Sequence, residues 1–452
     1  MSVLFKGGTI INASGRYLAD VFAEGNKIKA IGTNLDNGAD EVVDAKGKYI
    51  LPGAIDPHTH ISMPFMGTHA QDDYETGTIA AACGGITCVV DFDLQQKGET
   101  LLEALERKKA LAQGKVCVDY SLHPAVMDPR PDVIDEVKKA CLEYGTPSFK
   151  IFMVYDFRVD DATMIKLLEV TKKYGGLVQV HAENVYIIQH MNEVLEKEGK
   201  LEPYYHAVSR PNIAEEEAVG RAAKMVELTG SRIYIVHLSS KEGLWKVKEA
   251  RDHGVKVYAE TCPHYLVFTD EELKRRGSLA KMSPPLRQQA DVDALWQAVE
   301  DGAIDVIGSD AAGHTVASNE PLFDDIFAAP HGIPGLDTLF NLSYEIGVNA
   351  GRITLPHLVK MTCENPAKIF GLYPRKGVLE KGADADVVIF DPAIAHTIPD
   401  KNPHTHVDYS LYAGHRCLGA PVVVIQRGQV VMENGEIKAE PGQGRYLAGQ
   451  LT

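Results

Sequence analysis

The chain has 452 residues, of which 45% are hydrophobic and 24% are charged, and its formal net charge is −16. This acidic balance argues against nucleic acid and anionic lipid as partners, because most of the surface would repel either one. No apolar run of about 20 residues is available to cross a bilayer, and the length exceeds one small core, so we expect two domains and no membrane segment.

The first 50 residues contain short β-prone runs that glycine and asparagine interrupt. The runs read VLFKGGTIIN, LADVFAEGNKIKAIG and EVVDAKGKYI, which is typical of antiparallel strands joined by tight turns. The opening residues lack the basic and apolar stretches of a secretory signal, and the seven cysteines are scattered without a disulfide framework. We therefore expect a protein of the reducing cytoplasm.

From Leu51 the pattern changes to an apolar β-branched run, a polar or glycine turn and an amphipathic stretch of helical length, which together recur eight times. This alternation predicts a (β/α)8 barrel. A doubly wound open sheet would give a similar local pattern, but no GxGxxG motif follows an early strand. The predicted barrel strands are Leu51–His58, Thr87–Phe92, Val116–His123, Ser148–Val154, Leu177–His181, Arg232–His237, Lys256–Glu260 and Ile304–Asp310.

After Gly382 the sequence returns to strands, in DADVVIFDP and APVVVIQRGQVVMENGEI, whose glycine and asparagine breaks indicate hairpins. We expect this tail to pack with the N-terminal strands. The predicted organisation is a discontinuous β-sandwich domain of residues 1–50 and 380–452, attached to a catalytic barrel of residues 51–379.

Side chains of the types that bind metals fall at the carboxyl ends of the predicted barrel strands, where barrel enzymes carry their active sites. His58 and His60 end the first strand, and their spacing of two places both imidazoles on one face. One histidine alone is more often a hydrogen-bonded packing residue, but four further strand ends also carry candidate ligands. These are Lys150, His181, His237 and Asp310.

Lys150 is the unusual member of this set, because an ammonium group would repel a cation. A lysine considered alone is more often snorkelling or salt-bridged than metal-binding, but here histidines stand on adjacent strands. A lysine carbamylated by carbon dioxide is an anion with two oxygens, one for each of two ions. Imidazole and carboxylate suit zinc and similar ions. We therefore predict two divalent metal ions, with Zn²⁺ the best match, bridged by N6-carboxylysine at Lys150.

A series of motifs resembles the cyclic amidohydrolases, particularly their dihydropyrimidinase and hydantoinase branch, from the N-terminus to about Arg427. The motifs are LPGAIDPHTHISMPFMGT, SFKIFM, VHAEN, YHAVSRP, VHLSS, ETCPHYL, SPPLR and GAIDVIGSD. The resemblance implies that the chain opens the cyclic amide of a hydantoin or 5,6-dihydropyrimidine to an N-carbamoyl amino acid. It also implies a homotetramer with a small-molecule substrate.

The resemblance implies a role for each candidate residue. His58, His60 and Asp310 would hold one metal, His181 and His237 the other, and carbamylated Lys150 would bridge them. Asp310 would also act as general base. The remaining family positions would bind the substrate: Tyr155 as donor to the developing oxyanion, Ser283 and His331 at the ring amide, and Met63, Phe65 and Met66 around the ring substituent.

Two departures from the family pattern leave the substrate open. Ala311 follows Asp310 where the family commonly has histidine, with His314 as a nearby substitute, and His331 stands where asparagine is usual. Allantoin or another cyclic ureide is therefore an alternative substrate. Dihydroorotate is disfavoured, because the stretch after His60 reads ISMPF and lacks the arginine that clamps a carboxylate. A non-catalytic assembly protein of the same superfamily is the alternative from another class, although such relatives generally lose several ligands.

Overall fold

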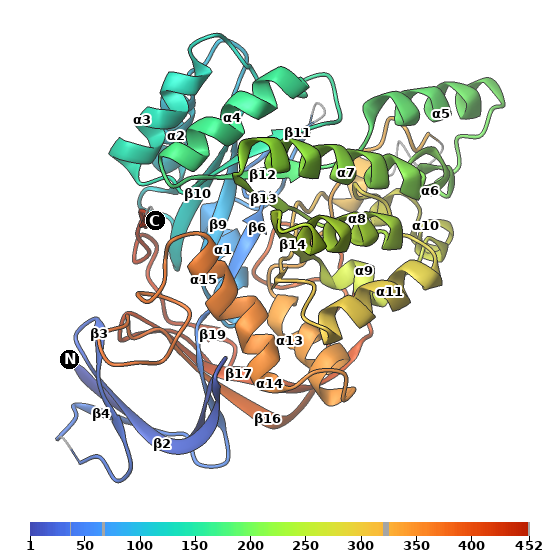
Figure 1. Cartoon of the computed structure of the whole chain (residues 1–452). Coiled ribbons are helices and arrows are strands. Elements are labelled where there is room, and N and C mark those ends of the chain that lie inside the picture. Colours follow the sequence, from blue (N-terminus) through green and yellow to red (C-terminus); the bar gives the residue numbers. More distant parts are fainter. Residues whose placement is uncertain (37, 66–67, 320–324, 451–452) are drawn as a thin grey trace.

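The computed structural model describes residues 1–36, 38–65, 68–319 and 325–450, with the side chain of Phe65 also outside the described part. Two large sheets organise the chain. One is the parallel sheet of a barrel, and the other contains strands from both ends of the sequence, which lie beside each other below the barrel (Figure 1).

The described residues form an eight-stranded parallel sheet in the order β15-β14-β13-β12-β11-β10-β9-β6. A parallel bridge between Thr59 and Ala311 joins its two ends, and the Ala311 carbonyl accepts a hydrogen bond of 3.0 Å from the His60 amide. The sheet is therefore closed into a barrel. Its strands are β6 (Ala54–Thr59), β9 (Ile86–Leu94), β10 (Asp119–Ala125), β11 (Ser148–Phe152), β12 (Leu177–His181), β13 (Arg232–Ile235), β14 (Lys256–Thr261) and β15 (Val306–Ile307).

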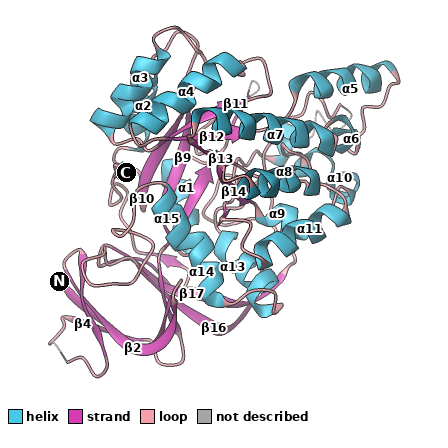
Figure 2. Cartoon of the chain, in the orientation of Figure 1, coloured by secondary structure: helices cyan, strands magenta, loops and turns pink. Residues whose placement is uncertain are grey.

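Helices surround these strands (Figure 2), and their first turns are fixed by polar caps. Thr100 and Glu103 form a reciprocal capping box at the start of α2, and Asp73 accepts two backbone N–H groups at the start of α1. The longer helices are α1 (Tyr74–Cys83), α2 (Leu101–Ala112), α3 (Val133–Tyr144), α4 (Asp161–Lys173), α5 (Val185–Lys197), α7 (Asn212–Thr229), α8 (Lys241–Asp252) and α11 (Gln289–Glu300). Shorter helical segments are α6 (Tyr205–Ser209), α9 (Pro263–Val267), α10 (Glu271–Arg276), η1 (Gly277–Ala280), α12 (Val316–Asn319), α13 (Leu339–Ser343), η3 (Tyr344–Asn349), α14 (Leu355–Val359), η4 (Lys360–Glu364) and α15 (Asn365–Ile369).

The second sheet combines N-terminal and C-terminal strands in the order β19-β18-β17-β16-β5-β1-β2-β3, with β4 paired to β1. Antiparallel pairing of β5 with β16 joins the two ends of the chain. A two-stranded hairpin of β7 (Pro64–Phe65) and β8 (Thr68–His69) lies elsewhere, after the first barrel strand. The strands of the second sheet are β1 (Ser2–Asn12), β2 (Gly15–Glu24), β3 (Lys27–Gly32), β4 (Glu41–Asp44), β5 (Tyr49–Pro52), β16 (Val387–Thr397), β17 (Arg416–Gln426), β18 (Gln429–Glu433) and β19 (Glu436–Ile437).

The predicted fold class is confirmed: a barrel with an additional sheet built from both termini. The predicted strand Leu51–His58 combines parts of two observed strands. Leu51 lies in β5 of the second sheet, and the first barrel strand, β6, begins at Ala54. Gly53 separates them where the chain passes Thr87 closely, since a Cβ there would lie 2.0 Å from the Thr87 hydroxyl oxygen. The domain boundaries stay a prediction. Tyr446 pairs with Tyr120 of β10, so the C-terminal residues return to the barrel.

A buried ion cluster connects the barrel with the segment that leads into β16. The Lys376 ammonium lies 2.7 Å from a carboxylate oxygen of Asp119 in β10, 3.1 Å from Asp384 and 2.6 Å from Asp386, and Arg427 also pairs with Asp119. Burial alone would lower the pKa of Lys376, but the surrounding carboxylates raise it well above its usual value. The lysine therefore stays charged and balances these acids.

Lys376→Met is expected to destabilise the fold by about 3–5 kcal/mol, because it leaves buried carboxylates without their shared cation. Urea unfolding followed by circular dichroism measures the loss. Lys381→Met is the control, since Lys381 is exposed, and it should change the free energy of unfolding by no more than about 0.5 kcal/mol. Equal stability of the two variants would contradict the balancing role of Lys376.

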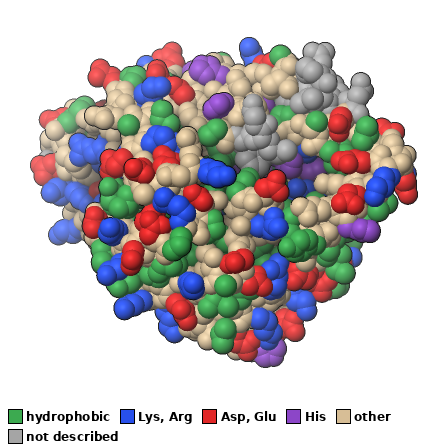
Figure 3. All heavy atoms as spheres, turned by 90° about the horizontal axis from the view of Figure 1, so that it is seen from above, with side chains coloured by type: hydrophobic (Ala, Val, Ile, Leu, Met, Phe, Trp, Pro, Cys, Tyr) green, Lys and Arg blue, Asp and Glu red, His purple; other side chains and the backbone are tan. Residues whose placement is uncertain are grey.

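Among the described residues, no helix is both long enough and apolar enough to pass through a bilayer. The face seen from above mixes acidic and basic side chains with apolar ones (Figure 3).

Candidate metal centre

The predicted ligands lie where parallel strands of the barrel end. His58 is in β6 and His60 directly follows it, while His181 is the last residue of β12. His237 and Asp310 lie just beyond β13 and β15 and have positive backbone φ angles of 40° and 52°. Such left-handed conformations cost energy in residues other than glycine, and they cluster at functional sites.

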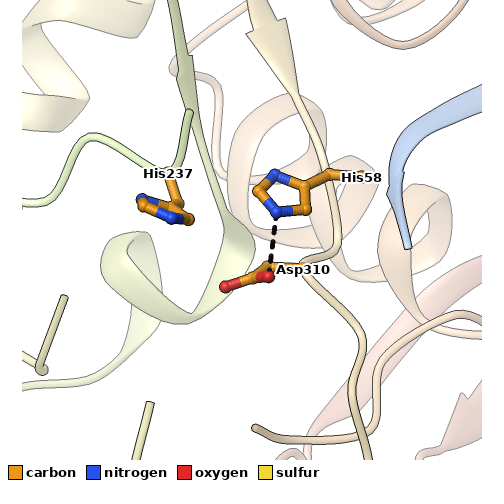
Figure 4. Close-up of side chains that lie close together, drawn as sticks. All are labelled: His58, His237 and Asp310. Atoms are coloured by element: carbon orange, nitrogen blue, oxygen red, sulfur yellow. Dashed lines mark ion pairs between the residues drawn. The ribbon is translucent and has the colours of Figure 1, made fainter. Parts of the chain in front are cut away.

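Side chains from these strand ends converge, as Figure 4 shows for His58, His237 and Asp310. The Asp310 carboxylate oxygen Oδ1 lies 3.0 Å from Nε2 of His58 and 3.0 Å from Nε2 of His60. In the described part of the chain, His58, His237 and Asp310 bring one ligand atom each to within 4.8 Å of one another. The rings of His181 and His237 are 4.5 Å apart between centroids. These five candidate ligands therefore lie close together.

Lys150 joins the same cavity from β11. A pocket of about 50 Å³ is lined by Lys150, His60, His181, His237 and Asp310, among others. The Lys150 ammonium lies 4.7 Å from the centre of the Phe92 ring, and burial lowers its pKa to about 8. This environment disfavours the charged amine and favours the neutral, nucleophilic form that carbon dioxide can modify.

The donor set fits divalent cations. Nδ1 of His60 and Nδ1 of His237 are buried and have no hydrogen-bond partner among the described atoms, an arrangement that costs free energy unless another ligand satisfies them. Burial lowers the pKa of both imidazoles, which favours the neutral form that binds metal. Burial alone would raise the pKa of Asp310, but the adjacent His58 and His60 hold it well below its usual value. The imidazoles of His60 and His237 are therefore held neutral near an ionised carboxylate. Burial alone would lower the pKa of His58, but Glu260 and Asp310 raise it to about 9, so this imidazole would release a proton on binding a metal ion.

Two carboxylates that the sequence analysis did not single out, Glu260 and Glu183, form hydrogen bonds with candidate metal-binding histidines. Glu260 accepts from His58 Nδ1 at 2.5 Å, and it also accepts the Tyr234 hydroxyl and the His237 amide. Glu183 lies 2.6 Å from Nε2 of His181. Carboxylates in this position fix the tautomer and the orientation of metal-binding imidazoles. Their only sequence signal was their place within ETCPHYL and VHAEN.

The predicted substrate contacts Tyr155, Ser283, His331 and Met63 also line the pocket. The Ser283 hydroxyl lies 2.5 Å from Nδ1 of His331, which fixes that ring. Burial raises the pKa of Tyr155, so the phenol keeps the proton it would donate. The side chain of Phe65 and all of Met66 lie outside the described residues, so their predicted contact with the ring substituent stays a prediction.

His314 was expected to substitute for the histidine that commonly follows the aspartate in the family, but it lies elsewhere. Nε2 of His314 lies 3.0 Å from the backbone carbonyl of His331 and can donate to it. His314 therefore supports His331 and is not among the residues that line the pocket.

A closed parallel barrel with imidazoles, a lysine and a carboxylate at its carboxyl end defines a barrel enzyme scaffold with a candidate metal centre. The sequence model of the amidohydrolase family matches residues 49–431. The chain belongs to this amidohydrolase family.

Relatives of known name resemble the chain over its whole length. It is 41% identical to a D-hydantoinase of Geobacillus stearothermophilus, over 99% of this chain and 96% of the relative, and 39% identical to a D-hydantoinase of Ralstonia pickettii, over 99% and 98%. A crystal structure of dihydropyrimidinase from Brevibacillus agri superposes with a TM-score of 0.98 at 39% identity, covering 100% of this chain and 99% of that one. The resemblance predicted from the motifs is thus confirmed.

Proposed function

We propose that the chain is a metal-dependent hydrolase that opens the cyclic amide bond of a hydantoin or 5,6-dihydropyrimidine to give an N-carbamoyl amino acid. The observation that carries this proposal is full-length similarity to hydantoinases and a dihydropyrimidinase, in a chain whose barrel brings together each predicted ligand. A ligand set this complete argues against the non-catalytic alternative.

Two divalent cations are the proposed cofactors, with Zn²⁺ as the best match to the imidazole and carboxylate donors. His58, His60 and Asp310 would hold one ion and His181 and His237 the other, with N6-carboxylysine at Lys150 between them. When bound, such a pair lowers the pKa of a shared water toward neutrality and polarises the amide carbonyl.

The chain's own residues would orient the ring and move the proton. Ser283 and His331, fixed to each other, would bind the ring amide, and Met63 would contact the substituent. The protonated Tyr155 would donate to the oxygen on which negative charge develops, a contribution of about 3 kcal/mol for one such donor. Asp310, held ionised, would take the proton of the attacking water and deliver it to the leaving ring nitrogen.

A panel of rings tests the substrate class. We expect the metal-loaded protein to open hydantoin and 5,6-dihydrouracil, measured by the loss of ring absorbance and by the N-carbamoyl product. Allantoin covers the ureide alternative, and dihydroorotate should be poor because the arginine is missing. Allantoin as the sole good substrate would replace the proposal. Failure of every ring with both metals bound would refute it.

A homotetramer in the cytoplasm completes the proposal. Similarity to hydantoinases supports the assembly, and the seven cysteines, all free, are compatible with a reducing compartment. Light scattering coupled to size exclusion would measure the oligomeric state.

A further inference from the structure

Arg210 lies behind the candidate site and has no role in the catalytic steps described above. It directly follows the short helix α6 and is 6% exposed. Its guanidinium forms an ion pair with Glu183, the carboxylate that also holds His181 at 2.6 Å. Burying a guanidinium costs free energy unless the charge is paired, and here the Glu183 carboxylate supplies the pairing charge.

The same guanidinium reaches the Tyr155 side chain. Its carbon Cζ lies 5.7 Å from the centre of the tyrosine ring, so the buried positive charge lies against the phenol. The Tyr155 ring also lies edge-on to His181, with the ring centres 5.6 Å apart. The tyrosine ring therefore contacts both a metal-ligand candidate and a buried cation.

Tyr155 needs such support because its backbone is strained. Its φ angle is 71°, in the left-handed region that side chains other than glycine rarely adopt. A strained residue keeps its conformation only where its surroundings determine it. Phe152 contributes a ring 6.0 Å away, and Arg210 adds a buried positive charge 5.7 Å from the ring centre.

Arg210 is itself held in place through its backbone. Its carbonyl accepts from Arg287, whose Nε donates to the Ser239 hydroxyl at 3.0 Å, and Glu215 accepts the backbone amides of Ser239 and Ser240. These contacts join the segments that follow β12, β13 and β14. The backbone of Arg210 is thus fixed relative to the loops that carry His237 and Ser283.

We propose that Arg210, held by Glu183, is a positioning residue that sets the Tyr155 phenol for donation to the developing oxyanion. This inference rests on the proposed ring-opening function. Arg210 does not touch the substrate in this scheme, so its effect must pass through Tyr155. The carboxylate of Glu183 connects this positioning to the imidazole of His181.

A double-mutant cycle on the metal-loaded enzyme tests the coupling. Tyr155→Phe and Arg210→Met should each lower kcat about 100-fold, since each removes the use of one oxyanion donor, with KM changing much less. The double variant should fall no more than about fivefold below Tyr155→Phe, because the arginine would have no phenol left to position. Multiplied losses, or full activity of Arg210→Met, would overturn the inference.

Further measurements separate positioning from damage to the fold. Metal content by mass spectrometry should stay at the wild-type ratio in Arg210→Met, and loss of metal would contradict an effect through Tyr155. Arg210→Lys, which keeps the charge, should recover part of kcat and remains informative if the methionine variant does not fold. The control is Arg221→Met, since Arg221 has two carboxylate partners on α7 and α4, and its kcat should be unchanged. An inactive wild-type enzyme would instead refute the proposed function.

Discussion

Replacing Lys150 by alanine is expected to remove the metal ions and to lower ring-opening turnover by about 10³-fold or more, equivalent to about 4 kcal/mol of transition-state stabilisation. Lys150 is 1% exposed and lines the pocket together with His181, His237 and Asp310. Alanine removes the group that, once carbamylated, would give one oxygen to each ion. The remaining imidazoles would then have to hold two mutually repelling cations without a bridging anion, so we expect the ions to be lost.

Metal content per chain and the rate of hydantoin opening measure this result, and the intact mass of the wild type should show the added carbon dioxide. Lys376→Met is the control for loss of a buried lysine, because Lys376 lies in the cluster around Asp119. It should lose stability but keep its metal. A Lys150→Ala enzyme with full activity would refute the bridging role.

The barrel was predictable because its strands are buried on both faces. Such strands appear in the sequence as continuous apolar runs. Leu177–His181 was predicted with its observed bounds, since local composition determines such a strand. Leu51 was misplaced because the two apolar runs around Gly53 differ in their partners and not in their composition. The last strand is shorter than predicted: beyond Ile307, the Ser309 amide bonds the Asp56 side chain at 3.1 Å in place of a strand partner.

Most candidate ligands were predictable because they stand at or beside the end of a predicted strand, and barrel geometry brings strand ends together. Lys150 lies within β11 and was singled out because histidines stand on adjacent strands. The supporting carboxylates were not singled out: Glu260 has remote partners, and Glu183, although only two positions from His181, also pairs with a remote arginine. Glu260 meets His58 from 202 positions away, and Glu183 meets Arg210 from 27 positions away. A single acidic residue in a motif indicates no partner, so these pairings required the three-dimensional structure.

Asp310→Asn is expected to keep the metal ions and to lower kcat by about 10³-fold, the range of a lost general base. Asparagine has nearly the same shape and retains a carbonyl oxygen where Oδ1 of Asp310 meets His58 and His60 at 3.0 Å. The amide cannot take up the proton of the attacking water. Its KM should change little, because the residues proposed to bind the ring amide are Ser283 and His331.

The matched control is Asp305→Asn, at the opposite end of the same barrel segment, where Asp305 pairs with Arg251 outside the pocket. This variant should keep both metal and kcat, although it loses some stability with its ion pair. Metal analysis alongside kcat then separates the two proposed roles of Asp310. Metal loss in Asp310→Asn equal to its loss of turnover would contradict the general-base role, because ligation alone would then explain the defect. Retained metal with normal turnover would assign the proton transfer to another group.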